Sequence, residues 1–348
     1  MSVNSLIRDG IIHKFNYPVH VWDLKEGEGW HHNPSICRDD TGRVWLSKRH
    51  HDKLPLIVHL SPKDLDPKIR DEASRLVVGF LNEKTLEVTG QKLITPEEGS
   101  PSYIFNKNIE DCRIFWRPDG LHGIGVAIND SDHKFKITQI EILIDYEKAT
   151  YKLLRDYGQP HDHVEKNWRA PAVPARAFDF IYSPNEIVLD GKVYGEEYDG
   201  FTHGGSQLLP YKDGWISIVH QVVPVRGVTA RWYATFAELH DYLGKVTHVS
   251  QFFDFGSGWR ENLQESVEFV SGAIWSKGKE EKELLLSLGV RDETCGFVRV
   301  PTSVFKWNPI EDVIYYNFVF GGNHIKEPDR NRIEPIATTI SGEPVLAK

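Results

Sequence analysis

Short runs in which apolar and polar residues alternate, or in which β-branched and aromatic residues are concentrated, recur along most of the chain. Such runs predict strands, whereas long stretches with the 3.6-residue spacing of an amphipathic helix are scarce. The clearest predicted strands cover residues 43–49, 75–82, 113–118, 123–128, 178–183, 215–222, 231–239, 273–277, 283–290 and 296–300. The pattern therefore predicts an all-β fold.

Turn signals separate these runs, namely "DDTG", "RPDG", "LDGK", "YKDG" and "DYLG". Residues 62–77 have room for one short helix or turn, and residues 137–150 fit either a strand or a helix. The tail after Asn331 is predicted to be irregular. The turn-flanked pairs recur in units of roughly 40 to 70 residues, a spacing at which propellers must be considered. Without a shared signature, periodicity alone leaves a propeller and a sandwich open.

The composition fits a globular protein with a large core. Of the 348 residues, 40% are hydrophobic and 11% are aromatic, and no low-complexity segment or clear linker divides the chain. This length allows two ordinary domains or one large all-β domain of repeated units. The net charge of −9 argues against a nucleic-acid backbone as the main partner. With no basic head followed by an apolar run, and no apolar stretch of membrane-spanning length, we expect a cytoplasmic protein without a membrane partner.

Metal and nucleotide motifs are weak. The three cysteines, Cys37, Cys112 and Cys295, lie far apart and form no disulfide framework or zinc pattern, so we expect reduced thiols and no metal. "HDH" at 161–163 lacks further ligands at a fixed spacing. "GGSQ" at 204–207 has neither the P-loop lysine nor the frame of a nucleophile elbow. No cofactor is predicted.

Polar clusters stand at the ends of the predicted strands, where loops meet a rigid scaffold. In a propeller such loop ends converge on one axial pocket. That arrangement would gather Asn33, Arg49, Asp111, Lys166, His203, His220, Glu268 and Asp292.

The most informative cluster is "IEDCR" at 109–113, at the start of a predicted strand. Glu110 and Asp111 are adjacent carboxylates, and Arg113 follows two residues later. A structural ion pair would explain such a sequence, and so would a catalytic acid held by its neighbours. The residues alone leave both explanations open.

Taken together, the motifs resemble glycoside hydrolase family 130, whose members are five-bladed β-propellers, mostly β-mannoside phosphorylases with some β-1,2-mannosidases. "IEDCRIFW…GIGVA" is similar to the family's "EDPR" strand, and "HHNPSI" and "VWLSKR" resemble strands of its first blade. "GGSQLLPYKDGWISIVHQV" and "ELLLSLGVRDETCG" resemble two later segments in the family's order. The resemblance covers roughly residues 30–305, and it implies one β-propeller domain over residues 1–348.

The resemblance also implies roles for individual residues. Asp111 matches the general acid, which protonates the leaving oxygen directly or through a sugar hydroxyl. Asn33, Arg49 and Asp292 match sugar-binding positions, and Lys166 and His220 fall at phosphate-binding ones. We further expect Glu110, Arg113, His203 and Glu268 among the substrate-binding residues.

Two positions depart from the family's pattern. Ser183 stands where the family has a second phosphate-binding Arg, and a Lys with a Ser cannot grip phosphate as two arginine forks do. Cys112 replaces a Pro beside the acid. If water were the nucleophile, a second carboxylate would have to act as base, and Glu268 and Glu238 are candidates.

We therefore expect an enzyme that cleaves or forms a glycosidic bond with inversion, on a β-mannoside-like oligosaccharide. Inorganic phosphate is an allowed co-substrate, and a homo-oligomer is allowed. One alternative is a glycosyltransferase that uses a sugar-phosphate or nucleotide-sugar donor. Another is a propeller that binds sugar without catalysis.

Overall fold

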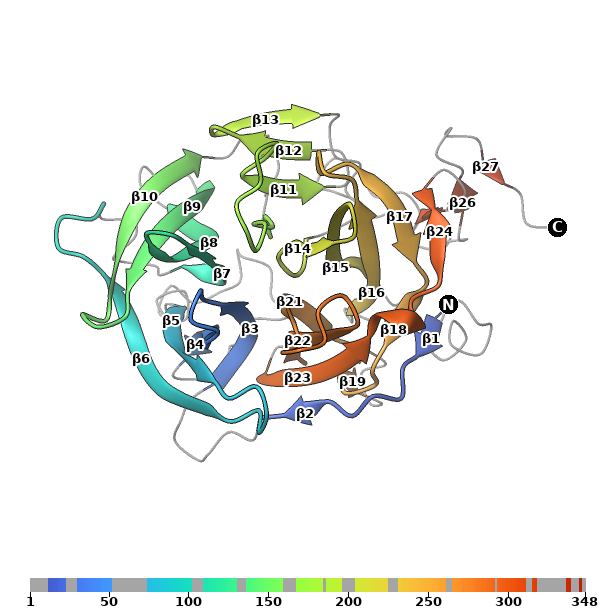
Figure 1. The fold of residues 1–348 in the computed structure, drawn as a ribbon, viewed down its shortest axis with the longest axis horizontal. Helices are drawn as coiled ribbons and strands as arrows, with labels where there is room; N and C mark the ends of the chain where they lie inside the picture. Colours follow the sequence, from blue (N-terminus) through green and yellow to red (C-terminus); the bar gives the residue numbers. More distant parts are fainter. Residues whose placement is uncertain are drawn as a thin grey trace, which may run out of the picture.

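In the computed structural model, most of the described residues form strands arranged around a central axis (Figure 1). The described residues are 12–22, 30–51, 74–101, 109–129, 136–158, 167–183, 186–195, 204–224, 231–260, 265–291, 293–310, 315–317, 336–338 and 344–345. They contain no α-helix, and their one 3₁₀ helix is η3 (Thr302–Val304). The chain is an all-β, five-bladed propeller, as predicted.

The first two blades are four-stranded and share one sheet. Blade 1 contains β3 (Trp30–Arg38), β4 (Val44–His51), β5 (Arg75–Leu81) and β6 (Val88–Pro96). Blade 2 contains β7 (Glu110–Arg117), β8 (Gly120–Asn129), β9 (Lys136–Asp145) and β10 (Thr150–Gly158). Their outer strands join the blades, because β6 and β10 pair in parallel with Thr95 opposite Thr150. β3 and β7 are the inner strands.

The remaining blades continue around the axis. Blade 3 contains β11 (Phe180–Ser183), β12 (Glu186–Leu189) and β13 (Lys192–Gly195), and the inner segment 167–172 attaches through an Arg169–Ile181 bridge. Blade 4 contains β14 (Leu209–Tyr211), β15 (Gly214–Pro224), β16 (Arg231–His240) and β17 (Val246–Ser250). Blade 5 contains β21 (Glu268–Trp275), β22 (Glu283–Val290) and β23 (Thr294–Pro301).

Further short strands, several of them from the two ends of the chain, pair with the blades or with one another. β1 (Ile12–Lys14) pairs in parallel with β18 (Phe252–Asp254), and β2 (His20–Val21) pairs with β23. β19 (Trp259–Arg260) pairs with β20 (Glu265–Ser266), and β24 (Trp307–Pro309) pairs with β17. A separate sheet contains β25 (Tyr315–Asn317), β26 (Ile336–Thr338) and β27 (Pro344–Val345).

The core lies between the blades. Residues 284–290 of β22 are buried without alternation, because both faces of this strand are covered by protein. Leu286 and Leu288 pack with Ile216 and Phe253 in a cluster shared by blades 4 and 5. A second cluster, shared by blades 1 and 2, contains Val78 and Ile142.

The structure settles several predictions about elements. The segment 137–150 forms β9 and the start of β10, so the strand alternative is right. The tail after Asn331 includes β26 and β27, which the prediction of an irregular tail missed. The expected short helix falls largely on residues 52–73, outside the described residues. A single domain over the whole chain stays a prediction. None of the described helical residues forms a stretch long and apolar enough to span a membrane.

Candidate active site

Two inner strands carry the same backbone feature at the same end. Asn33 in β3 and Asp111 in β7 both have a φ of 50°, in the left-handed region. Each lies at a register shift, between His32 and Ser35 in blade 1 and between Glu110 and Arg113 in blade 2. Asn and Asp tolerate this region better than most residues, and bulges that redirect a side chain are common beside active sites.

Buried serines satisfy the backbone groups that these bulges release from the sheet. The Pro34 carbonyl accepts hydrogen bonds from Ser271 Oγ at 2.7 Å and from Ser287 Oγ at 2.6 Å, both in blade 5. The Cys112 carbonyl accepts one from Ser47 Oγ at 2.8 Å. A buried backbone group without a partner costs free energy. By binding these carbonyls, the serine hydroxyls remove that cost and stabilise the bulged conformations.

The two bulges place their side chains in contact. Asn33 Nδ2 donates a hydrogen bond to Asp111 Oδ1 at 2.8 Å, across 78 residues of sequence. Asn33 is 7% exposed and Asp111 is 8% exposed, so the Asp111 carboxyl is nearly enclosed and retains slight access to solvent. The contact with Asn33 fixes the direction of the carboxyl group, and fixed orientation is one requirement of general acid–base catalysis.

Arg49 and Glu110 flank this carboxyl. Arg49 Nη2 binds Glu110 Oε1 at 2.7 Å, and Nη1 lies 3.6 Å from Asp111 Oδ1. Ser74 Oγ accepts a hydrogen bond from Arg49 Nε at 2.7 Å, which fixes the guanidinium plane. The Arg49 and Glu110 side chains are 18% and 17% exposed, so both reach the edge of solvent next to Asp111.

Arg113 lies beneath the site. It is 2% exposed, and its guanidinium donates to the Gly205 carbonyl at 2.7 Å, the Asp111 carbonyl at 3.2 Å and Asn167 Oδ1 at 2.9 Å. Burial lowers the pKa of Arg113 to about 10, so it stays charged at neutral pH. These contacts connect inner segments of blades 2, 3 and 4, and they favour a supporting role over direct substrate contact.

The cysteines are set apart from this chemistry. Cys37, Cys112 and Cys295 are free and buried. Burial raises the pKa of Cys112 and that of Cys295 to about 12, so neither thiol ionises at neutral pH. Cys112 follows Asp111 directly, and its side chain points into the blade 1–blade 2 core cluster. This thiol therefore acts as a small apolar residue.

Sequence reasoning missed three residues around the site. Asn167, which binds Arg113, has a φ of 70° and repeats the left-handed feature in blade 3. His32 pairs across the sheet with Arg49, and burial together with the Arg49 charge lowers the pKa of His32 well below its ordinary value, which keeps the ring neutral. The available signal for Asn167 was an Asn or Asp near the start of an inner segment, as at Asn33 and Asp111.

Gly289 is the third missed residue. A Cβ at this position would lie 2.3 Å from Asn33 Oδ1 and 3.1 Å from the Asn33 backbone nitrogen. Blade 5 therefore approaches the Asn33 bulge so closely that only glycine leaves room. No local pattern in "SLGVRD" marks this contact.

Replacing Gly289 with Ala is expected to reduce turnover by about tenfold to a hundredfold, because the added methyl group displaces Asn33 and with it Asp111. The measurement is kcat in the glycoside cleavage that the sequence predicts. Gly278→Ala is the control, since it strains a turn at φ 74° with no atom within 4 Å of the new Cβ. Equal turnover in Gly289→Ala and wild type would contradict the packing argument.

Glu268 starts the inner strand of blade 5, but it is held by a loop. Its carboxylate accepts hydrogen bonds from Phe255 N at 2.7 Å, Ser257 N at 2.6 Å, Ser257 Oγ at 2.7 Å and Gly258 N at 3.0 Å. Glu268 is 1% exposed. These four donors favour a structural role for Glu268 over the predicted substrate contact or base.

The same residue predicts a pH dependence of stability. Burial and the Asp254 carboxylate raise the pKa of Glu268 to about 7, from 4.5 for a free side chain. Between these values the folded chain keeps a proton that the unfolded chain has released, so the free energy of unfolding falls as pH rises from about 5 to about 7. We expect a loss on the order of 2–3 kcal/mol, seen as a falling Tm in calorimetry.

Asp254→Asn removes the neighbouring charge and is the matched variant for this effect. Its Tm is expected to vary less across the same pH range than that of the wild type. Parallel curves for the two proteins would contradict the assignment to Glu268.

Glu238 and His220 also lie in the interior. Glu238 Oε2 binds Arg169 Nη1 at 2.7 Å and lies 3.2 Å from His240 Nε2. Burial opposes ionisation, but Arg169 and His240 outweigh it and lower the pKa of Glu238 to about 2. His220 packs against the rings of Tyr233 and Phe269, each with its centroid 4.9 Å away. Its expected phosphate contact stays a prediction.

Three predicted site residues, Lys166, His203 and Asp292, lie outside the described residues. Ser183 ends β11, where it pairs with Glu186. Among the described residues, the structure thus brings together Asn33, Arg49, Glu110 and Asp111, with Arg113 beneath them.

Comparison with solved structures places this geometry in context. A β-1,2-mannobiose phosphorylase from Listeria innocua, in complex with β-1,2-mannobiose, matches with a TM-score of 0.52 and 15% identity, over 82% of this chain and 93% of that one. A glycoside hydrolase family 130 structure, from work on hydrolases that target β-1,2-mannosidic linkages in Candida mannan, matches with a TM-score of 0.51 and 12% identity, over 79% and 85%. The chain has the fold of glycoside hydrolase family 130.

A more distant source gives the same fold. A mannose phosphorylase from Leishmania mexicana, in complex with phosphate, matches this family 130-like propeller with a TM-score of 0.54 and 12% identity, over 86% of this chain and 92% of that one. No family model and no curated protein matches the sequence. At these identities the likeness establishes the fold, and activity has to be argued from the site.

Proposed function

We propose that the protein is a carbohydrate-active enzyme that cleaves or forms a β-mannoside-like glycosidic bond with inversion, with Asp111 as general acid. The observation that carries the proposal is the Asn33–Asp111 hydrogen bond between two bulged inner strands. It orients one nearly buried carboxyl group at an end of the propeller's inner strands, with Arg49 beside it.

Asp111 would deliver a proton to the leaving oxygen, directly or through a sugar hydroxyl. Asn33 holds one carboxyl oxygen in place. Arg49 would bind substrate hydroxyls at the exposed edge, where the Glu110 carboxylate fixes it in position. Orienting the acid and the sugar in this way supplies much of the rate enhancement that a glycosidase needs.

The nucleophile must approach the opposite face of the sugar ring. Water would need a second carboxylate as base, but both candidates, Glu268 and Glu238, are engaged by other groups. Phosphate needs only a cationic cradle, to which Lys166 and His220 are expected to contribute. The engagement of both carboxylates favours phosphorolysis, or the reverse synthesis from a sugar 1-phosphate, over hydrolysis. Ser183 in place of a second phosphate-binding Arg weighs the other way, because it predicts a weaker grip on phosphate.

The test is product analysis with purified protein and β-linked mannobioses or other β-linked disaccharides, each with and without phosphate. We expect a sugar 1-phosphate that forms only when phosphate is present. Free monosaccharide released at the same rate without phosphate would establish hydrolysis and remove the argument from Glu268 and Glu238. Absence of turnover on every disaccharide, in both directions, would favour a sugar-binding propeller and overturn the proposal.

A further inference from the structure

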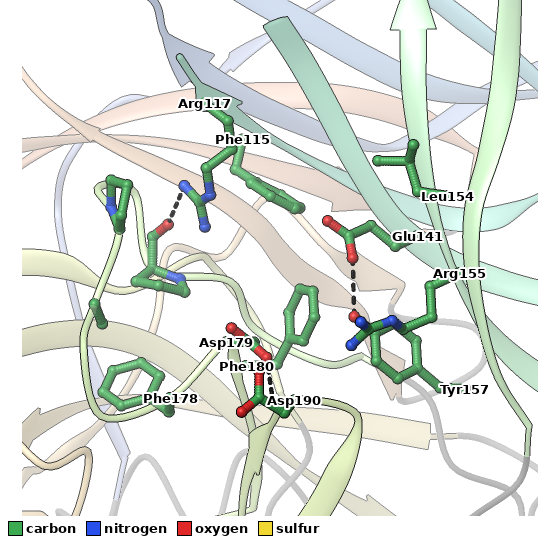
Figure 2. Close-up of a pocket in the computed structure, with 13 residues that line it drawn as sticks. Phe115, Arg117, Glu141, Leu154, Arg155, Tyr157, Phe178, Asp179, Phe180 and Asp190 are labelled. Carbon is green, nitrogen blue, oxygen red and sulfur yellow. Dashed lines mark hydrogen bonds between the residues drawn. The ribbon is translucent and has the colours of Figure 1, made fainter. Parts of the chain in front are cut away.

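A cavity of about 330 Å³ lies between blades 2 and 3, and Figure 2 shows its lining. Such a volume is at the small end of the range for small-molecule sites. The lining comes from the end of β7, from β9 and β10, from the segment that leads into β11, and from the turn after β12. The residues are Phe115, Arg117, Glu141, Leu154, Arg155, Tyr157, Pro171, Pro174, Ala175, Phe178, Asp179, Phe180 and Asp190.

This cavity is distinct from the candidate active site. Asp111 lies at the start of β7, and Arg117 is the last residue of the same strand. Six residues of extended strand separate them by roughly 20 Å. One monosaccharide cannot touch both places, so the cavity would bind its own ligand.

Aromatic rings form a rigid wall. Phe180 packs edge to face against Phe115, with centroids 6.0 Å apart, and against Tyr157, with centroids 5.6 Å apart. Phe178, two residues before Phe180, packs against Trp215 of β15. Phe115, Phe178 and Phe180 are each at most 2% exposed, so these rings support the wall from behind. The apolar surface that a ligand can reach comes from the exposed Leu154 and Pro174 and from the partly exposed Tyr157 ring.

Two polar groups of the lining are held in place by protein contacts. Arg117 Nη1 donates to the Pro171 carbonyl at 3.1 Å, and its guanidinium lies 4.4 Å from the Phe115 ring centroid. Glu141 accepts a hydrogen bond from Tyr157 Oη at 2.8 Å (Figure 2). Glu141 also lies 3.1 Å from His122 Nδ1. These contacts fix the Arg117 and Glu141 side chains in position before a ligand binds.

Three other groups retain capacity to bind a ligand. The Arg155 guanidinium lies over the Tyr157 ring at 5.5 Å, and it donates no hydrogen bond to any described residue. Asp190, at a φ of 51° in the turn after β12, donates its backbone N–H to Asp179 Oδ2 at 2.8 Å. That bond leaves the second Asp179 oxygen and the Asp190 carboxylate as acceptors.

We propose that this cavity binds a neutral pyranose. A pyranose has an apolar face, which suits the exposed apolar side chains and the partly exposed Tyr157 ring, and hydroxyl groups that both donate and accept. The lining offers guanidinium donors and carboxylate acceptors side by side, and charge-assisted bonds to both are strong. The carboxylates of Glu141, Asp179 and Asp190 would repel an anionic ligand. The guanidinium groups of Arg117 and Arg155 would repel a cationic one. The inference stands apart from the proposed function, because it uses no residue of the candidate active site.

The test is methyl NMR of the full chain labelled with ¹³C at leucine methyl groups. Leu154 lines the cavity and is 40% exposed, and its signals can be assigned with a Leu154→Met variant. The probes are the methyl pyranosides of mannose, glucose and galactose, with inorganic phosphate and methylammonium as charged comparisons. We expect saturable shifts of the Leu154 signals with at least one pyranoside, at a Kd on the order of 1–10 mM.

Variants separate this cavity from the active site. Asp190→Ala and Arg155→Ala are each expected to weaken the pyranoside binding by about tenfold. Lys152→Met, an exposed change on the same strand as Arg155 and outside the lining, should leave the Kd unchanged, as should Asp111→Asn. Wild-type-like methyl spectra of the two alanine variants would show that they are folded.

Three results would overturn the proposal. The first is the absence of any shift of the Leu154 signals at pyranoside concentrations of about 100 mM, well above the expected Kd. The second is tighter binding of phosphate or methylammonium than of every pyranoside. The third is a pyranoside Kd that is unchanged in both alanine variants. If disaccharide turnover fails while these shifts appear, the proposed function falls and the cavity assignment stands.

Discussion

Asp111→Asn is expected to lower turnover of an unactivated β-linked disaccharide by about 10²–10⁴-fold, the usual contribution of a general acid. The amide has the shape of the carboxyl group, and its oxygen can still accept the hydrogen bond from Asn33. The variant should therefore fold normally and bind substrate with a similar affinity. Only the proton for the leaving oxygen is lost. The measurement is kcat and KM for both proteins on the same disaccharide.

An aryl glycoside with a dinitrophenolate leaving group provides the control for this prediction. That leaving group departs without a proton, so a variant that lacks only the acid keeps most of its activity on it. Equal losses on the disaccharide and the aryl glycoside would place Asp111 in substrate binding or in folding. Full activity on both would remove it from the mechanism.

Arg169→Met is expected to lower the free energy of unfolding by about 3–5 kcal/mol, the range for breaking a buried ion pair from one side. Arg169 and Glu238 are 0% and 1% exposed, and Arg169 Nη1 also donates to Ser217 Oγ at 2.6 Å. Without the guanidinium, His240 is the one charged or titratable partner that the described residues leave to the buried Glu238 carboxylate. The measurement is urea unfolding at neutral pH.

The matched control is the double variant Arg169→Met/Glu238→Leu. Replacing both members of a buried pair with apolar residues is often close to neutral, so most of the lost stability should return. If the single variant lost less than about 1 kcal/mol, or the double variant were no more stable than the single one, the ion pair would not be the cause. This pair also explains why Glu238 is unsuited to act as a base.

Much of the fold is visible in the sequence because the blades are built from local patterns. The predicted run 283–290 forms β22 with the same bounds, because an apolar run that is short and flanked by turns suits a strand covered on both faces. The ambiguous stretch 137–150 could not be decided locally. Its pairing with β8 and β10, which the sequence does not display, selected the strand.

The candidate site was only partly visible. The adjacent acids at 110 and 111 drew attention to Asp111, and the resemblance pointed to Asn33. Their direct contact depends on two bulges that lie side by side only in the folded ring. Proximity in sequence suggested a salt bridge from Arg113 to the Asp111 carboxylate, but the bulge directs the guanidinium to the Asp111 carbonyl instead.

Glu268 shows a different limit of sequence reasoning. Like Asp111, it is a carboxylate at the start of an inner strand, and the two look equivalent in sequence. The backbone N–H groups of residues 255–258 bind the Glu268 carboxylate, and these donors come from a loop whose path no local pattern predicts. Gly289 was missed for a related reason, since its importance lies in a neighbour from the opposite end of the chain.

The central claim is that Asp111 protonates the leaving group in an inverting reaction at the axial site. A real-time ¹H NMR assay with a β-mannobiose and phosphate, run in parallel for wild type and Asp111→Asn, tests it most directly. The account predicts that the first product of the wild type is an α-configured sugar, as the 1-phosphate, and that the variant forms it at least about 100-fold more slowly. A β-configured first product, or equal rates for the two proteins, would contradict the account.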